Sequence, residues 1–318
     1  MTKRGLDEAG ALAILRSELP DLARGVRLGI GDDAAVLRAT QGEQVWTIDA
    51  CMEGAHFLRT WLSAEDLAHK SLHAAVSDVA AMGAKPTAAL VQLTLAPWLT
   101  AAFLRRFARE QATVARELGC PIVGGNLTAG ERLEIVTTAL GQVPGRALLR
   151  RGARAGDELW LVGPVGQARL GLLALEAGLA QKRPLAPYVS AFRRPKALLT
   201  EGRRLAGVAH ACLDVSDGLR RDAPRLAGQS GVRVVIERAR LERLLAPPFA
   251  SAARTLGVDP VQTMLEGGED YALLATGPQG KRPRFARAIG RIEAGEGAWL
   301  ETNERLFPLT GGFQHHAD

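Results

Sequence analysis

The sequence has 318 residues, enough for two ordinary domains, and its composition of 47% hydrophobic and 23% charged residues is that of a globular protein with a proper core. No apolar stretch is long enough to span a bilayer and the N-terminus lacks an apolar signal core, so we expect a cytoplasmic protein without a membrane partner. The net charge of +6 is accompanied by only 5% aromatic residues, and no basic cluster carries stacking side chains, which argues against nucleic acid as a partner.

A glycine turn with two adjacent acids follows the first predicted helix, which apolar spacing places over residues 7–18. The segment LGIGDDAAVL sets Asp32 and Asp33 side by side behind a Gly-Ile-Gly turn. Like charges in such a turn repel each other, and a cation such as Mg²⁺ or Ca²⁺ would relieve the repulsion. A solvated Asx turn is the alternative that this stretch alone leaves open.

A predicted strand over residues 44–48 delivers Asp49 to a glycine-containing loop, in which Glu53 and His56 follow. Loops at strand ends commonly carry function, because the strand fixes the loop while its backbone stays open to a ligand. A single histidine in such a loop is nevertheless more often structural than functional.

The next predicted helix covers residues 63–82 and opens with a capping box formed by Ser63 and Asp66. Asp78 interrupts its apolar stripe near the C-terminal end, where the helix dipole disfavours a carboxylate. We therefore expect Asp78 to meet a cation or another strong partner.

The rest of the first half alternates strands and a helix. A β-rich run over residues 87–95 precedes a helix over 100–118, and a short buried strand then leads to Gly124, Gly125 and Asn126. Residues 133–140 form another alternating strand. This order of elements favours helices packed on one face of a mixed sheet.

A basic, glycine-containing connector around residues 145–157 marks the expected domain boundary. A strand over 159–163 and a Gly-Pro-Val-Gly turn lead into a helix, residues 184–195 are predicted as a loop, and 196–205 as a helix. The glycine spacing matches neither a Rossmann nor a Walker phosphate loop.

Two further acid motifs lie in the second half. Asp214, Ser216 and Asp217 form D-x-S-D-G at the end of an apolar strand, where Gly218 opens the next helix. Helix N-terminal amides there could bind a phosphate, although an elaborate N-cap explains the motif equally well. A strand over 232–236 and a helix over 248–256 precede the sequence GGEDY and a final predicted strand that ends near residue 276.

Many acids stand in special turns, outside ordinary helix faces. They are Asp32, Asp33, Asp49, Asp78, Asp214, Asp217, Glu269 and Asp270. If these carboxylates converge, they cannot all stay ionised without cations. Mg²⁺ shared between carboxylates and substrate phosphates would resolve the conflict, and the reaction class implied is phosphoryl transfer.

A series of motifs falls in the order of the thiamine-monophosphate kinase family, which the chain resembles from about residue 6 to its end. The motifs are LGIGDDAAVL, TIDACMEGAHF, AVSDVAAMGAKP, GGN, GRALLRRGA, LDVSDGL and GGEDY. The wider superfamily includes aminoimidazole ribonucleotide synthetase, selenophosphate synthetase and a hydrogenase maturation factor. GGEDY together with the D-x-S-D-G-L motif indicates the kinase.

The resemblance implies ATP-dependent, Mg²⁺-dependent phosphorylation of thiamine monophosphate to thiamine diphosphate by direct in-line transfer. It also implies a two-domain α/β fold with mixed sheets, in which the N-terminal sheets of two subunits pair in a homodimer. Residues 1–148 would form the domain that binds ATP and Mg²⁺ and dimerises, and residues 149–318 an α/β domain that completes the active site.

The resemblance also implies roles for the residues that match the family's motifs. Mg²⁺ ligands would be Asp33, Thr47, Ile48 through its backbone, Asp49, Asp78, Asn126, Asp214 and Asp217, and among them Asp33, Asp78 and Asp217 would be the catalytic acids. ATP would contact Gly125, Arg150 and Ser216, and thiamine monophosphate would contact His56, Glu269 and Phe313. An aromatic face suits the cationic thiazolium ring, and arginine suits a phosphate.

Two positions depart from the family's pattern. Asn126 stands where a metal-binding aspartate is expected, and because its amide oxygen brings no charge, metal affinity should fall. Ala75 replaces the asparagine that usually lies two residues before the Ser77–Asp78 pair. The alternatives are therefore an ATP-dependent synthetase of the same superfamily with another acceptor, or a weakly active or regulatory nucleotide-binding relative.

Overall fold

The computed structural model describes residues 8–19, 25–30, 34–39 and 41–310. The predicted site residues Asp33 and Phe313, and Asp32 beside the former, lie outside these ranges. The chain divides into two compact units, the first made of residues 1–79 and 84–146 and the second of residues 80–83 and 147–318.

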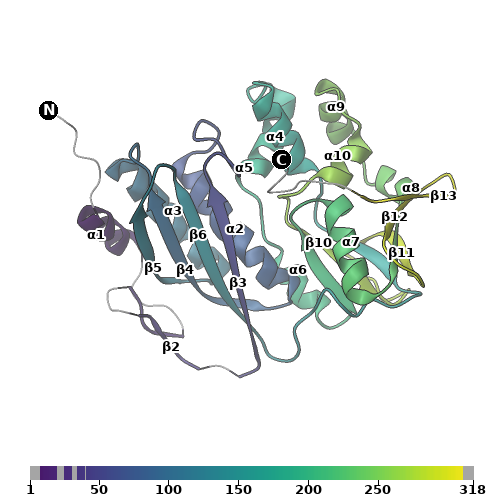
Figure 1. Ribbon diagram of the computed structural model, residues 1–318, viewed down its shortest axis with the longest axis horizontal. Helices are drawn as coiled ribbons and strands as arrows, with labels where there is room; N and C mark the ends of the chain where they lie inside the picture. Colours follow the sequence, from purple (N-terminus) through teal and green to yellow (C-terminus); the bar gives the residue numbers. More distant parts are fainter. Residues whose placement is uncertain (1–7, 20–24, 31–33, 40, 311–318) are drawn as a thin grey trace. The chain divides into compact units, whose positions relative to one another are not determined.

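The first unit is built on a four-stranded sheet with the order β3-β6-β4-β5. Its strands are β3 (Glu43–Met52), β4 (Lys85–Leu95), β5 (Ile122–Ala129) and β6 (Glu134–Val143). Neighbours are antiparallel except β4 and β5, which run parallel. Helices α2 (Ala64–Ala81) and α3 (Ala101–Leu118) cover one face of the sheet (Figure 1), so the predicted mixed α/β fold is confirmed.

Local sequence explains where α3 begins and ends. The Thr100 side chain accepts a hydrogen bond from the backbone of Phe103, and Gly119 closes the helix in the left-handed conformation with φ of 62°. The buried stripe includes Leu104 and Phe107, which pack toward the core as the helical spacing predicts.

Helix α1 (Glu8–Glu18) packs against α3. The Glu18 carboxylate accepts from Arg105 at 3.1 Å and from Arg109 at 2.8 Å, so one acid ties the two helices together. The short strands β1 (Val26–Leu28) and β2 (Val36–Leu37) pair with each other in an antiparallel sheet of their own.

Two strands are longer than the sequence predicted, and both carry candidate site residues inside them. Strand β3 continues to Met52, so Asp49 lies within the strand and pairs with Thr137 of β6. Strand β5 runs through Gly124, Gly125 and Asn126, because Asn126 pairs with Gln92 of β4. In each case the ladder with a neighbouring strand extends the element past the point where local apolar pattern stops.

The second unit is built on a seven-stranded sheet with the order β13-β12-β9-β11-β7-β10-β8. The strands are β7 (Glu158–Val162), β8 (Ala211–Val215), β9 (Arg233–Glu237), β10 (Ala272–Gly277), β11 (Arg287–Glu293), β12 (Ala298–Thr302) and β13 (Arg305–Pro308). Only β9 and β12 are parallel. The core of this unit includes the fully buried Trp160 together with Leu205 and Leu273.

Helices flank this sheet (Figure 1). They are α4 (Gln167–Glu176), η1 (Arg183–Leu185), α5 (Ala186–Arg193), α6 (Leu199–Leu205), α7 (Leu219–Ser230), α8 (Arg238–Glu242), α9 (Pro247–Thr255) and α10 (Pro260–Glu266). The prediction of a loop over residues 184–195 was wrong, since η1 and α5 occupy most of it. Proline stands in the first turn of both, a position that proline tolerates because the first amides have no helical partner.

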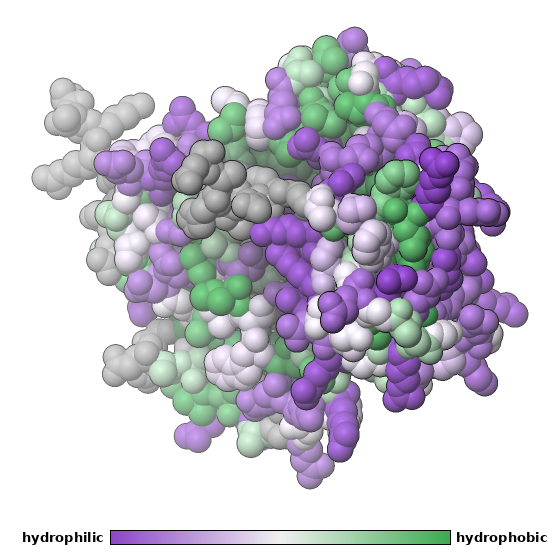
Figure 2. All heavy atoms as spheres, turned by 45° about the vertical axis from the view of Figure 1, so that its right-hand side comes forward, coloured by the Kyte–Doolittle hydropathy of each residue, from purple (hydrophilic) through white to green (hydrophobic). Residues whose placement is uncertain are grey.

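On the face shown in Figure 2, hydrophilic side chains prevail on the right-hand side of the view, and hydrophobic residues form smaller patches among them. In the part of the chain that the structure describes, no helix combines the length and the apolar character needed to cross a membrane.

Candidate active site

Thr47 of β3 and Asp78 of α2 come together in the first unit. The Thr47 hydroxyl donates a hydrogen bond of 2.6 Å to Oδ2 of Asp78. The sequence predicted that a carboxylate near the end of α2 would need a strong partner, and this hydroxyl is such a partner. Two oxygen donors of the predicted metal set are therefore in direct contact.

Asp49 lies two residues beyond Thr47 on β3, and alternation along a strand places both side chains on the same face. Its Oδ1 accepts a hydrogen bond of 2.9 Å from the backbone of Ala50. Ile48 points to the opposite face and is 67% exposed. Only the backbone of Ile48 could therefore join a site formed by Thr47 and Asp49.

These donors fit Mg²⁺ chemically, because a hydroxyl and two carboxylates are the hard oxygen ligands that this ion prefers. Within the described ranges, no group of three or more His, Cys, Asp or Glu side chains is close enough to hold a metal ion. The predicted set includes a hydroxyl, an amide and Asp33, which lies outside those ranges. The fit thus rests on Thr47, Asp49 and Asp78.

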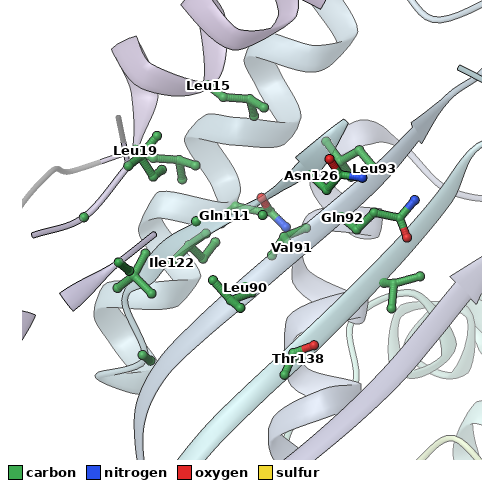
Figure 3. Close-up of a pocket in the computed structure, with 18 of the residues that line it drawn as sticks. Leu15, Leu19, Leu90, Val91, Gln92, Leu93, Gln111, Ile122, Asn126 and Thr138 are labelled. Atoms are coloured by element: carbon green, nitrogen blue, oxygen red, sulfur yellow. The ribbon is translucent and has the colours of Figure 1, made fainter. Parts of the chain in front are cut away.

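A pocket of about 720 Å³ lies in the first unit, and Gly124, Gly125 and Asn126 form part of its wall. Apolar side chains from α1 and from the sheet supply most of the rest (Figure 3). Gln111 of α3 also lines it, is only 1% exposed, and its Nε2 has no hydrogen-bond partner among the described residues. Nothing in the sequence distinguishes Gln111 from an ordinary polar residue of an amphipathic helix.

Gly125 has a structural reason to be glycine. A Cβ at this position would stand 1.8 Å from the backbone oxygen of Val91 on the parallel strand β4. Glycine at this position therefore permits the close approach of the neighbouring strand. Asn126, one residue further, is exposed.

His56 lies in the loop after β3, and a hydrogen bond from the end of that strand fixes its ring. The backbone amide of Met52 donates to Nδ1 of His56 at 3.1 Å, so the proton of the neutral ring is on Nε2. Glu53 fixes the same loop, because its Oε2 accepts from the Trp98 indole and from the backbone of Leu133, both at 3.1 Å. An Nε2–H donor on a fixed loop suits an anionic group of a ligand.

In the second unit, the D-x-S-D-G motif occupies the turn between β8 and α7, as the sequence predicted. Asp214 is a buried residue of β8, whereas Ser216 and Asp217 are half-buried in the turn. Gly218 has φ of 98°, and a Cβ there would meet the backbone of Glu266 at 2.8 Å. Glycine is required here because both its dihedral angle and its surroundings exclude a side chain.

The GGEDY segment packs directly on this turn. The backbone amide of Glu269 donates to the carbonyl of Ser216 at 3.0 Å, so the structure brings these two predicted site residues together. A Cβ on Gly268 would stand 2.0 Å from the same carbonyl oxygen. Glu269 itself adopts a left-handed φ of 65°, which is costly for a residue with a side chain and is often found at functional sites.

Asp270 does not join the acidic set in the way that the sequence suggested. It is 6% exposed, and its Oδ1 accepts from the backbone of Ala168 at 2.8 Å, at the start of α4. Burial raises its pKa to about 7, against the opposing effect of the amides of Ala168, Gly166 and Gln167. Asp270 is therefore a cap for a helix distant in sequence.

Arg150 is exposed, and its backbone carbonyl accepts a hydrogen bond of 3.0 Å from Ser230 of α7. The backbone of the preceding residue, Leu149, accepts from Cys212 of β8. The Arg150 side chain is thus carried by a segment fixed to β8 and α7, the elements that flank the D-x-S-D-G turn.

Asp222 and Arg225 of α7 contact the motif, and sequence analysis missed both. The buried Asp222 accepts from the backbone of Asp217 at 3.0 Å, and Arg225 donates to Asp217 and to Asp222. Burial raises the pKa of Asp222 to about 6, which the Asp217 amide and Arg225 oppose. The available signal was an acid and an arginine three residues apart on the helix that the motif opens.

The chain matches the profile of the family described as AIR synthase related protein, N-terminal domain, over residues 31–143. The solved structure of the hydrogenase maturation protein HypE from E. coli has the same fold, with a TM-score of 0.75 at 19% identity over 96% of both chains. These similarities define the class as an α/β protein of the AIR synthase-like fold.

Closer relatives define the family. Thiamine-monophosphate kinase from Aquifex aeolicus is 32% identical over 95% of this chain and 96% of its own length. The solved structure of AaThiL complexed with AMPPCP and TMP has a TM-score of 0.81 at 32% identity, and the match covers 90% of this chain and 92% of that one. The chain belongs to the thiamine-monophosphate kinase family, and it is a kinase.

Proposed function

We propose that this enzyme transfers the γ-phosphoryl group of ATP to thiamine monophosphate and thereby forms thiamine diphosphate and ADP. A phosphate oxygen of thiamine monophosphate would attack the γ-phosphorus in line, and the bond between that phosphorus and the bridging oxygen of ADP would break. The proposal is supported by the similarity to a relative complexed with AMPPCP and TMP. The observation that carries it within this chain is the contact between Thr47 and Asp78.

We assign Mg²⁺ to the predicted oxygen donors. The ligands would be Asp33, Thr47, the backbone of Ile48, Asp49, Asp78, Asn126, Asp214 and Asp217. Bound Mg²⁺ would supply charge neutralisation for the transferred group, on which catalysis of phosphoryl transfer chiefly depends. The carboxylates of Asp33, Asp78 and Asp217 are the ones that we expect to be indispensable.

The nucleotide would contact Gly125, Arg150 and Ser216. Gly125 would make this contact through its backbone, since a side chain at this position would collide with the backbone of β4. Thiamine monophosphate would contact His56, Glu269 and Phe313. The Nε2–H of His56 suits the phosphate, and the aromatic ring of Phe313 suits the thiazolium cation.

Residues 1–148 would bind ATP and Mg²⁺ and form a homodimer, and residues 149–318 would supply the remaining site residues. The exposed face of the four-stranded sheet supports the dimer, because Trp46 is 62% and Ile48 67% exposed and large exposed apolar groups mark interaction surfaces. ATP as co-substrate agrees with a cytoplasmic location.

The test is to incubate the purified protein with ATP, Mg²⁺ and thiamine monophosphate and to follow thiamine diphosphate and ADP by chromatography. We expect equal amounts of both products, and none when Mg²⁺ is chelated. The Asp78→Asn variant is the matched control, since it keeps the shape of the side chain and loses its charge. Absence of thiamine diphosphate at high enzyme concentration would overturn the proposal.

A second candidate function is that of a weakly active or regulatory nucleotide-binding relative. It is favoured by Asn126, which stands where a metal-binding aspartate is expected. Tight ATP binding without turnover in the same experiment would support this candidate. An ATP-dependent synthetase with another acceptor would instead release ADP only when that acceptor is supplied, and it has little reason to keep His56 and Glu269.

A further inference from the structure

Asp217 is held by a closed ring of hydrogen bonds at the start of α7. Oδ2 of Asp222 accepts from the backbone amide of Asp217 at 3.0 Å, and Oδ1 of Asp222 accepts from Nη1 of Arg225 at 2.6 Å. Nη2 of Arg225 completes the ring by donating to Oδ2 of Asp217 at 2.7 Å. The main chain and the side chain of Asp217 are thus both tied to one buried carboxylate.

The ring is rigid because its central member is inaccessible. The Asp222 side chain is 1% exposed, whereas that of Arg225 is 35% and that of Asp217 16% exposed. A buried carboxylate with charge-assisted hydrogen bonds from a planar guanidinium has few alternative arrangements. The Asp217 carboxylate consequently has its orientation set from inside the unit.

The contacts of the ring also distinguish the two oxygens of Asp217. Arg225 donates to Oδ2, and Nε of Arg221 lies 3.6 Å from the same oxygen. A guanidinium that occupies one carboxylate oxygen leaves the other to face a cation. Arg225 is anchored by Asp222 as well as by Asp217, so it can stay in place when a cation arrives.

We propose that Asp222 and Arg225 are a positioning pair that orients the Asp217 carboxylate to receive a divalent cation through Oδ1. This inference rests on the Mg²⁺-dependent reaction proposed above. The pair would act through Asp217, the residue that both contact. Partners behind a metal ligand typically change metal affinity by about 10–100-fold when they are removed.

The experiment measures Mn²⁺ binding by electron paramagnetic resonance, with a non-hydrolysable ATP analogue present, for the wild type and the variants Arg225→Met, Arg225→Lys, Asp222→Asn and Asp217→Asn. We expect Arg225→Met to weaken Mn²⁺ binding about tenfold and to resemble Asp217→Asn. Arg225→Lys keeps the charge but lacks the fork that reaches two carboxylates, so it should be intermediate. Asp222→Asn should also be intermediate.

Arg238→Met is the matched control. Arg238 lies on α8 of the same unit, is 31% exposed and pairs with Glu242 at 2.9 Å, so its loss tests the general effect of removing a paired arginine. It should leave Mn²⁺ binding unchanged. In the kinase assay, Arg225→Met should raise the Mg²⁺ concentration for half-maximal rate about tenfold, with a much smaller loss of kcat at saturating Mg²⁺.

Unchanged or tighter Mn²⁺ binding in a folded Arg225→Met protein would overturn the proposal, and tighter binding would identify Arg225 as a competitor of the cation. A wild type that binds no Mn²⁺ would overturn it as well. If the wild type binds Mn²⁺ but does not phosphorylate thiamine monophosphate, the proposed function fails. The comparison of Mn²⁺ binding between the wild type and the variants still tests whether Asp222 and Arg225 position Asp217. Thermal unfolding of each variant establishes that it is folded.

Discussion

Asn126 is the side chain at which a single charge separates this chain from the pattern expected of its family. It is exposed on β5, which forms an edge of the four-stranded sheet. An edge position with access to solvent tolerates a carboxylate, because no desolvation is needed. The residue can therefore be changed without disturbing the fold, and any effect can be assigned to the site.

We predict that Asn126→Asp lowers the Mg²⁺ concentration for half-maximal rate several-fold. An added carboxylate contributes attraction to a divalent cation that an amide oxygen lacks, worth on the order of 1 kcal/mol at an exposed position. The measurement is a Mg²⁺ titration of the initial rate for wild type and variant. Asn126→Ala is the control, and it should shift the titration in the opposite direction.

A titration that is identical for wild type, Asn126→Asp and Asn126→Ala would show that position 126 takes no part in cation binding. The departure from the family's pattern would then have no functional meaning.

The helices and strands that carry the site differ in how far local sequence predicts them. The need of Asp78 for a partner follows from its position in a helix and was predicted. Its partner, Thr47, is 31 residues away in the sequence and lies on β3. This contact depends on how α2 packs on β3, which no local pattern predicts. The strands that carry Asp49 and Asn126 were predicted too short for the same reason, because pairing with a neighbour sets their length.

Asp270 is the clearest case of an element that depends on a distant residue. It was grouped with the acids that share cations, yet it caps α4 from a position 102 residues further along the chain. Helix α4 begins at Gln167, and its N-cap residue, Gly166, offers no side-chain cap. A sequence can show that an N-cap is missing, but only the folded structure, which brings the segment between α10 and β10 to the start of α4, identifies the residue that replaces it.

We predict that Asp270 makes stability fall as the pH rises. Its pKa is about 7 in the folded protein against 3.8 for the free side chain. The folded state therefore holds the proton more tightly between these values. This preference stabilises the folded protein fully below about pH 4, and the stabilisation is lost as the pH rises through 7. Its contribution to the free energy of unfolding is at most about 4 kcal/mol.

The measurement is urea unfolding of wild type and Asp270→Asn from acid to neutral pH. Asparagine keeps an oxygen acceptor for the helix amides and cannot titrate, so the variant should gain on the wild type as the pH rises. Parallel stability curves for the two proteins would contradict a raised pKa at this position.

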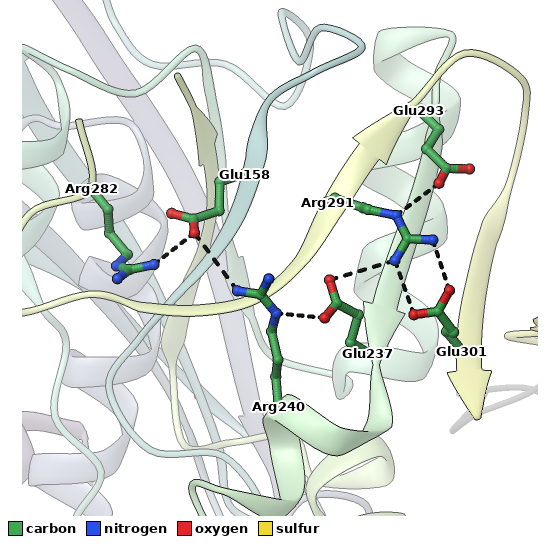
Figure 4. A network of polar contacts seen from close by, with 7 residues as sticks. All are labelled: Glu158, Glu237, Arg240, Arg282, Arg291, Glu293 and Glu301. Carbon is green, nitrogen blue, oxygen red and sulfur yellow. Dashed lines mark hydrogen bonds and ion pairs between the residues drawn. The ribbon is translucent and has the colours of Figure 1, made fainter. Parts of the chain in front are cut away.

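At the scale of the whole molecule, the charged surface of the second unit is organised into a network that crosses its sheet (Figure 4). Arg291 of β11 is at one end, with two hydrogen bonds to Glu301 of β12 at 3.0 and 2.8 Å and one to Glu293 at 2.8 Å. Arg291 also lies 3.5 Å from Glu237 of β9, and Arg240 links Glu237 to Glu158 of β7. Four strands are thereby joined by ion pairs.

We predict that Arg291→Met destabilises the protein by on the order of 1 kcal/mol in dilute salt and by less in concentrated salt. The Arg291 side chain is 36% exposed, which limits the gain from each pair, but its removal leaves three carboxylates facing each other. Thermal unfolding at low and high ionic strength measures both effects. Arg282→Met, at the other end of the network, removes a single contact with Glu158 and should cost less.

One face of the four-stranded sheet exposes a row of apolar side chains, and this row bears on the proposed dimer. Ile48 and Leu90 both pair in register with Thr138 of β6, so they lie in one row across three neighbouring strands. They are 67% and 38% exposed, and Trp46, two residues before Ile48, is 62% exposed. A sheet face with such residues in water is costly for a monomer, at roughly 25 cal/mol per Å² of apolar surface.

We predict that Trp46→Lys shifts the protein from dimer to monomer at micromolar concentration, as measured by light scattering. Lysine is strongly hydrated, so burying it against a second copy of the sheet would leave a charge without a partner. Arg254→Lys on α9, a surface change in the second unit, should leave the mass unchanged. A wild type that is monomeric at every concentration would refute the proposed dimer, because the exposed row would then have no second copy to cover it.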